Sequence, residues 1–223
     1  MATHLDLEEQ EQLEALKHFW NPWGNPITWV LIVALGTYAA FNGWEWWQRR
    51  QGALASALYG ELERSADAGD MTHLQRVLSD IQGKYGGTAY ATHGVLLGAR
   101  ALHENGQTDA AKAALSWVID KGSDEGLRAV ARLRLASVQM GEQAPEQALQ
   151  TLSAKFPPAF EAMAADRRGD VLLLQGKRSE AAAEFGKAWQ GLERSGEYRE
   201  LVGIKLNALG IDPRASSRAG STS

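Results

Sequence analysis

The chain of 223 residues contains no cysteine. This absence excludes a disulfide scaffold, a zinc or iron–sulfur site built from thiolates, and a cysteine nucleophile. It leaves the redox compartment open, because a protein without thiols is compatible with both the cytosol and the periplasm.

An excess of positive charge is also missing. The formal net charge is −4, and residues 1–26 alone carry five acidic side chains and one lysine, so the remainder of the chain is neutral. Nucleic-acid-binding domains carry a basic patch or stripe that neutralises phosphates. The charge distribution therefore argues against a nucleic-acid partner.

Patterns of catalytic and metal-binding residues are lacking as well. The five histidines show neither an HExxH motif nor another paired spacing. Gly176-Lys177-Arg178 resembles the end of a phosphate-binding loop, but Val171 stands where its first glycine is needed and Arg178 where its hydroxyl residue is needed. We therefore expect no catalytic residue, no metal ion and no cofactor, and interpret the protein as non-enzymatic.

Charged side chains are absent from residues 18–44 when His18 is counted as neutral, and residues 27–44 are mostly apolar. A helix of that length rises about 27 Å, close to the hydrocarbon thickness of a bilayer. Pro26 suits the first helical position and Asn25 suits the N-cap. The pattern predicts a single transmembrane helix over 26–47.

Two alternatives to a membrane anchor remain open, a buried core helix and a cleaved signal peptide. The length of the charge-free run and its flanking tryptophans argue against a core helix. The acidic segment before the run, and its end in Trp44-Glu45-Trp46-Trp47, argue against a signal peptide, although Ala53-Leu54-Ala55 imitates a cleavage site.

Tryptophans mark both ends of the predicted span, as they do at membrane interfaces. Six of the eight tryptophans belong to this set, with Trp20, Trp23 and Trp29 at one interface and Trp44, Trp46 and Trp47 at the other. The other two, Trp117 and Trp189, are interpreted as packing residues.

Small residues within the span form two pairs at four-residue spacing, Gly36 with Ala40 and Ala39 with Gly43. Such pairs let a second membrane helix approach closely, although glycine and alanine are also simply common in membrane helices. Orientation is weakly indicated. Lys17 precedes the span while Arg49, Arg50 and Arg64 follow it, which favours a cytoplasmic C-terminal side, but large domains translocate largely regardless of charge.

The remaining sequence alternates between helix-forming stretches and glycine or proline breaks, without the alternation of a strand. The expected helices cover 50–66, 71–83, 89–104, 108–120, 125–140, 145–154, 159–175, 179–193 and 197–209. Short helices joined by short loops predict helical hairpins.

An internal pattern recurs three times in these helices. A small residue is followed twelve positions later by alanine and sixteen positions later by a larger apolar residue, in the triads Ala99, Ala111 and Leu115; Ala136, Ala148 and Leu152; and Gly169, Ala181 and Phe185. This is the tetratricopeptide pattern, in which small residues allow the two helices of a hairpin to approach. Turn glycines Gly106, Gly141 and Gly176 recur every 35 residues. We expect an α-solenoid, whose stacked hairpins offer an extended surface to partners.

The last expected helix, 197–209, would cap the final repeat with Leu201, Ile204, Leu206 and Leu209 facing inward. The segment after it lacks apolar periodicity and is predicted to be a disordered tail. The fold class is thus all-α, with one transmembrane helix followed by a tetratricopeptide-like solenoid. The predicted organisation is an N-terminal segment over 1–25, the span over 26–47, a helical connector or first hairpin over 48–87, the repeat domain with its capping helix over 88–210, and the tail over 211–223.

Several strings along the chain closely resemble the YfgM family, the ancillary subunit of the bacterial SecYEG translocon. They are Glu9 to Trp20, EQEQLEALKHFW; Trp44-Glu45-Trp46-Trp47; Leu133-Arg134-Leu135-Ala136; Arg168-Gly169-Asp170-Val171 with Gly176; and Leu201 to Leu209, LVGIKLNAL. The resemblance covers about residues 8–210, and the order and spacing of the strings are specific.

The resemblance implies a short cytoplasmic N-terminus, one inner-membrane span and a periplasmic tetratricopeptide-like domain. It also implies association with the SecYEG translocon and with the membrane-anchored periplasmic chaperone PpiD, and help for exported unfolded proteins. We follow this topology over the weak Lys/Arg count. The alternative is a membrane-tethered scaffold for envelope or outer-membrane assembly complexes that does not contact exported chains.

Overall fold

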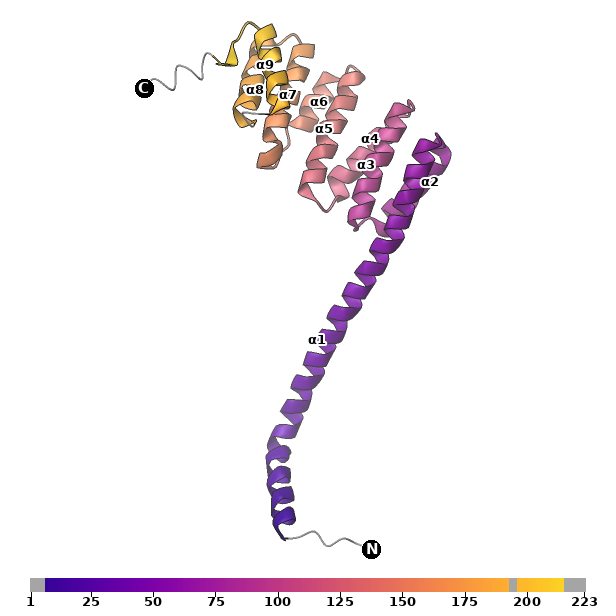
Figure 1. The fold of residues 1–223 in the computed structure, drawn as a ribbon, viewed down its shortest axis with the longest axis vertical. Coiled ribbons are helices and arrows are strands. Elements are labelled where there is room, and N and C mark those ends of the chain that lie inside the picture. The colour runs from indigo at the N-terminus through magenta and orange to yellow at the C-terminus, as the bar shows by residue number, and fades with distance from the viewer. Residues whose placement is uncertain (1–6, 193–195, 215–223) are drawn as a thin grey trace, which may run out of the picture. The chain divides into compact units, whose positions relative to one another are not determined.

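The computed structural model describes residues 7–192 and 196–214, and within these ranges it contains helices and no strand (Figure 1). The prediction of an all-α protein is confirmed. The helices are α1 (Leu7–Asp67), α2 (Met71–Tyr85), α3 (Ala89–Glu104), α4 (Thr108–Lys121), α5 (Glu125–Gly141), α6 (Pro145–Leu152), α7 (Pro158–Leu174), α8 (Arg178–Gly191) and α9 (Glu197–Ala208). The chain divides into two units after Gln51.

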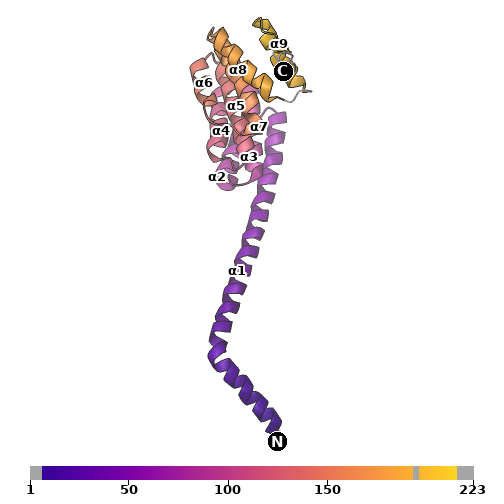
Figure 2. The ribbon, with the colours of Figure 1, turned by 90° about the vertical axis from the view of Figure 1, so that its left-hand side faces the viewer.

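The first unit contains the N-terminal part of α1, which runs through Pro22 and Pro26. The expectation that a helix begins at Pro26 with Asn25 as its cap is therefore wrong. Each proline removes one backbone hydrogen bond, and here the prolines lie within the helix instead of ending it. Thr28 Oγ1 also donates to the Gly24 carbonyl at 2.7 Å, a bond type that favours bending. Figure 2 shows α1 changing direction near its N-terminal end.

The second unit is a stack of helical hairpins. Residues 52–67 of α1 lie beside α2, since Leu62 and Leu74 share one core and His73 Nε2 lies 2.8 Å from Glu61 Oε1. Then α3 pairs with α4, α5 with α6 and α7 with α8, while α9 follows the last hairpin (Figure 1). The first helices of consecutive hairpins also contact each other, α3 with α5 and α5 with α7. Closer approach on one side curves the stack, so these first helices form the inner layer of the solenoid.

The hairpin turns explain where the helices end. Gly106 and Gly176 adopt the left-handed conformation, with φ of 76° and 74°. In the middle hairpin the equivalent position is Gln143, with φ of 58°, and Gly141 is the last residue of α5. The expectation that Gly141 is the turn glycine is therefore wrong. The repeats are unevenly spaced, and the regular spacing of the three glycines is a coincidence.

Side chains cap the N-termini of three helices. Asp70 accepts a hydrogen bond from the His73 amide in α2, Thr88 accepts one from Ala91 in α3, and Asp124 accepts one from Leu127 in α5. These caps satisfy amides that lack a partner within the helix. They set the first residue of each helix within one position of the prediction.

Candidate membrane and protein-binding surfaces

The apolar part of α1 presents its side chains outward. Within the described part of the chain, one helix is long and apolar enough to cross a membrane by length and composition. Its most apolar window has a mean hydropathy of 1.4, and no residue of that window is buried. Trp29, Val33 and Phe41 are 65%, 63% and 68% exposed. A helix with apolar residues on all sides and no protein covering them suits a lipid environment and not a protein core.

The six flanking tryptophans are all largely exposed. On the C-terminal side Trp44 and Trp47 lie with ring centroids 5.3 Å apart, and the Arg50 guanidinium lies 5.4 Å from the Trp46 ring centroid. Aromatic rings beside a cation are typical of the headgroup region. Their placement at the membrane interface stays a prediction.

The small residues of the span have open space beside them. A side chain added at Gly36 or Gly43 would meet nothing within 4 Å, and Ala39 and Ala40 are exposed. This face therefore has no partner within the described part of the chain. A packing role for it stays a prediction.

The three repeat triads are buried, one in each of three core clusters. Ala99, Ala111 and Leu115 belong to the first; Ala136, Ala148 and Leu152 to the second; and Ala181 and Phe185 to the third, against which Gly169 packs. A Cβ at Gly169 would lie 2.5 Å from Cε1 of Phe185, whose side chain is fully buried. The small residue is needed because the ring occupies the space of its side chain.

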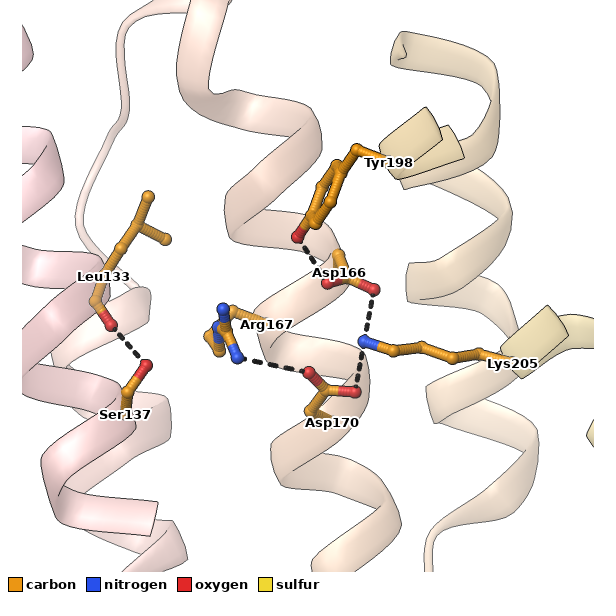
Figure 3. Close-up of polar contacts among 7 residues, drawn as sticks. All are labelled: Leu133, Ser137, Asp166, Arg167, Asp170, Tyr198 and Lys205. Atoms are coloured by element: carbon orange, nitrogen blue, oxygen red, sulfur yellow. Dashed lines mark hydrogen bonds and ion pairs between the residues drawn. The ribbon is translucent and has the colours of Figure 1, made fainter. Parts of the chain in front are cut away.

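A buried polar cluster joins α7 to α9 (Figure 3). The Tyr198 hydroxyl donates to Asp166 Oδ2 at 2.6 Å, and Lys205 Nζ lies 2.8 Å from Asp166 Oδ1 and 2.6 Å from Asp170 Oδ1. Arg167 Nη1 lies 3.6 Å from Asp170 Oδ2. The carboxylate of Asp166 is almost completely buried, so its charge depends on these partners.

The electrostatics of this cluster follow from burial. Burial and the hydrogen bond to Asp166 raise the pKa of the Tyr198 hydroxyl above its usual value of 10.0. Burial also raises the pKa of the Asp170 carboxyl, although the bond to Lys205 opposes the change. Because both oxygens of the buried Asp166 carboxylate take their partners from α9, the cluster fastens the capping helix to α7.

Arg168 makes a second network on α7. Its Nε donates to Glu184 Oε2 at 2.8 Å, its Nη2 to Glu161 Oε1 at 2.7 Å, and its Nη1 to the Leu152 carbonyl at 3.3 Å. The three residues of the string Arg168-Gly169-Asp170 thus join α7 to its neighbours. Arg168 bonds α6 and α8, Gly169 lies against the Phe185 ring of α8, and Asp170 pairs with Lys205 of α9. These contacts give the string a packing role.

The capping helix α9 buries only part of the face that was expected. Leu206 is buried and Leu209 is half-buried, as expected. Leu201 and Ile204 are 53% and 64% exposed and Val202 is buried instead, so the expectation that Leu201 and Ile204 face inward is wrong. Both stripes fit the helical period. Gly203 decides between them, because a Cβ there would lie 2.8 Å from the Trp189 ring. The inward face is therefore the one that carries the glycine.

The start of the predicted tail lies against α9. Pro213 is buried, and Arg214 Nη2 lies 2.6 Å from Glu200 Oε2. Residues 211–214 are therefore held to the domain, contrary to the expectation for this part of the segment. The rest of the predicted tail, 215–223, lies outside the described residues.

Sequence reasoning missed two features of the second unit. The polar cluster was missed because its partners are separated by more than thirty positions along the chain. The signal that could have found it is the pair Asp166 and Asp170, which lie four residues apart on one side of α7. The other is an open groove of about 290 Å3 between α3, α4 and α5, termed the α3–α5 groove, lined by Ala99, Arg100, His103, Leu115, Arg134, Ser137 and Val138.

No group of three or more histidines or carboxylates that could hold a metal ion occurs in the part of the chain that the structure describes. An exposed apolar helix followed by stacked, curved hairpins defines a membrane-anchored helical-repeat protein. Proteins of this architecture use an extended surface to bind other proteins.

The chain belongs to the family described as tetratricopeptide repeat-like domain, whose model matches residues 17–211. It is 27% identical over 210 residues to a Neisseria gonorrhoeae protein, covering 94% of this chain and 100% of the relative. It is 29% identical over 206 residues to a Haemophilus influenzae protein, covering 91% and 98%, and 28% identical over 212 residues to an Escherichia coli protein, covering 91% and 97%. All three are named ancillary SecYEG translocon subunit, which confirms the resemblance to the YfgM family. Together with the one apolar helix, the relatives fit a single-pass protein of the bacterial inner membrane.

Proposed function

We propose that this chain is a non-enzymatic adaptor of the Sec translocon in the bacterial inner membrane. The observation that carries the proposal is the alignment of the named translocon subunits along at least 91% of this chain, so that anchor and repeats match together. A relationship over the repeats alone would support only a generic binding domain.

The apolar helix over 26–47 is the tether in this proposal. Its tryptophans set its depth, and the face with Gly36, Ala39, Ala40 and Gly43 packs against a helix of the translocon, since small residues allow the close contact that drives association in lipid. Tethering raises the local concentration of the repeat domain beside the channel. Even a modest affinity for a partner then suffices.

The repeat domain over 88–210 faces the periplasm in this proposal, and residues 1–25 face the cytoplasm. There the domain binds the chaperone PpiD and helps to hand over exported proteins. The solenoid supports a binding role because its inner layer is an extended surface built from several helices.

Topology is tested by a phosphatase fused after Ser223. We expect alkaline phosphatase, which is active only in the periplasm, to be active in this fusion. An inactive phosphatase together with an active cytoplasmic reporter at the same position would reverse the proposed orientation.

Translocon contact is tested by photo-crosslinking within the span. A crosslinker at Gly36 or Ala40 is expected to yield SecYEG adducts, whereas one at Tyr38, on the opposite side of the helix, is the matched control. Adducts of equal yield at all three positions would show that no specific face packs against the channel.

The chaperone contact is tested by crosslinkers at exposed positions of α3, between Thr88 and Glu104, with Gln150 on α6 as the control. PpiD adducts from α3 support the adaptor. Absence of both SecYEG and PpiD adducts, with adducts to envelope assembly proteins instead, would favour the alternative of a scaffold that does not contact exported chains.

A further inference from the structure

We infer that the α3–α5 groove is the peptide-binding site of the repeat domain, and that it takes a segment with an apolar side chain flanked by carboxylates. This inference rests on the proposed function, because it names the chemistry of the partner that the repeat domain would bind.

The floor of the groove is apolar. Ala99, Leu115 and Val138 line it, and each of them is also part of the hydrophobic core around α3 and α4 or packed beside it. The volume of about 290 Å3 lies at the lower end of small-molecule pockets, roughly 300 to 1,000 Å3. The groove therefore suits a single anchoring side chain of a longer segment.

The rim of the groove is cationic. Arg100 and Arg134 supply its positive charge, His103 lines it beside them, and no carboxylate does. Arg100 uses only its Nε, in a pair with Glu104 at 2.7 Å whose side chains are 73% and 57% exposed. An exposed pair of this kind is worth little, so the terminal nitrogens of Arg100 remain available to a second carboxylate.

Arg134 makes the rim specific. Its Nη1 donates to the Leu96 carbonyl at 3.3 Å, which ties the guanidinium to α3, and it has no carboxylate partner among the described residues. Some cations of the same unit do have one, such as Lys112 with Glu142 and Lys205 with Asp166, whereas Arg128 resembles Arg134 in bonding a carbonyl, that of Gly122. A guanidinium held in place with its remaining donors unused is prepared for a carboxylate from another chain.

Charge complementarity therefore selects the occupant. Because the chain beyond residue 26 is neutral overall, the cationic rim is a local feature and not part of a general basic surface. An acidic segment is attracted to this rim, whereas a basic segment is repelled by it.

The inference is tested with the full-length chain in detergent and two short fluorescein-labelled peptides. In one, a central leucine is flanked by glutamates; in the other, lysines replace the glutamates. Fluorescence anisotropy is expected to show saturable binding of the glutamate peptide that weakens with salt, and no binding of the lysine peptide.

Two variants and one control test whether the peptide binds in the groove. Arg134→Ala is expected to weaken the glutamate peptide about tenfold, as for the loss of one charge-assisted bond. Arg132→Ala is the matched control, since it removes the same charge from the same helix outside the groove, and its affinity is expected to stay within about twofold of the unmodified chain. Ser137→Glu adds a carboxylate at an exposed position of the rim and is expected to abolish binding.

The outcomes separate this inference from the proposed function. Equal binding of the two peptides, no binding, or equal effects of Arg134→Ala and Arg132→Ala would overturn the inference. PpiD and SecYEG adducts would then still support the adaptor. Peptide binding as expected, with no adducts in membranes, would overturn the adaptor and leave the groove in place. Circular dichroism melting checks that each variant is folded, and Ser137→Glu tests the groove independently if Arg134→Ala unfolds.

Discussion

The apolar span of α1 and the repeat helix α3 are both rich in apolar residues, but those residues are exposed in the span and mostly buried in α3. Between Val30 and Phe41 the large apolar side chains of α1 are exposed, whereas nine residues of α3 are buried. In the span, apolar residues occur on every side of the helix. In α3 the residues that are not buried recur at helical spacing, as in His93, Leu97, Arg100 and Glu104. The distribution of apolar residues around the helix, together with the absence of charged side chains from residues 27–44, distinguishes the helix suited to lipid from the one suited to a protein core.

The two regions therefore rely on different surroundings for stability. The span needs a bilayer, because no protein in the described part of the chain covers its window. The repeats need their neighbours, because each hairpin buries its apolar face only against the next one. Substitutions of one kind should consequently have different effects in the two regions.

The largest expected difference comes from placing an arginine in each region. Val95→Arg puts a charge at a fully buried position of α3 and should cost more than about 4 kcal/mol, enough to unfold the repeat domain. Leu35→Arg, in the middle of the span, should cost about 2.5 to 3.5 kcal/mol of membrane insertion and leave the repeat domain folded.

Thermal unfolding by circular dichroism and alkaline extraction of membranes measure these two effects. If Leu35→Arg lowered the melting temperature as much as Val95→Arg, the two regions would not be independent.

The buried ion pairs of the repeat domain should contribute more to its stability than its surface pairs do. Asp166→Ala should destabilise the domain by about 2 to 3 kcal/mol, less than the roughly 3 to 5 kcal/mol of a fully buried pair, since Lys205 is 31% exposed and keeps Asp170. Arg214→Ala breaks an exposed pair with Glu200 and should cost at most about 1 kcal/mol. Urea unfolding of the two variants compares them, and equal losses would contradict the assigned role of the cluster.

Two glycines of the repeat domain allow a packed position to be compared with an open one. Gly169→Ala should destabilise the domain by about 1 to 3 kcal/mol, because the new methyl group overlaps the buried Phe185 ring. Gly186→Ala in α8 meets nothing within 4 Å and should stabilise the domain by roughly 0.5 to 1 kcal/mol. Melting temperatures that move in the same direction would contradict the packing argument.

The smallest effect expected is a dependence on alkaline pH. The pKa of Tyr198 is raised in the folded state, so the folded protein retains a proton that the unfolded chain loses near pH 10.0. Its contribution to stability is full below that pH and declines as the pH rises further. The free energy of unfolding, measured in urea between pH 9 and 11, should therefore fall less steeply in Tyr198→Phe than in the unmodified chain; equal slopes would contradict this.

Much of the fold could be predicted because its signals are local. The boundaries of α2 to α9 fall within about two residues of the expected helices, since caps and turn residues act on their immediate neighbours. The start of α1 was mistaken because prolines end a helix only when the chain beyond them has a better alternative, and here helix-forming residues continue on both sides. The left-handed Gln143 was missed because a non-glycine residue at such a turn leaves no mark in the sequence.

The amino-acid sequence alone indicates the apolar span and the three triads of small and large residues, because periodicity and spacing are properties of one helix or one hairpin. The buried stripe of α9 and the partners of Asp166 and Arg168 depend instead on how the helices pack. Val202 and Leu201 fit the helical period equally well, and the choice depends on Gly203 meeting the Trp189 ring from another helix. The same holds for the α3–α5 groove, because α3 brings Arg100 and His103, and α5 brings Arg134, around an apolar floor to which α4 adds Leu115. Contacts between elements distant in the chain depend on how those elements pack, which no local pattern specifies.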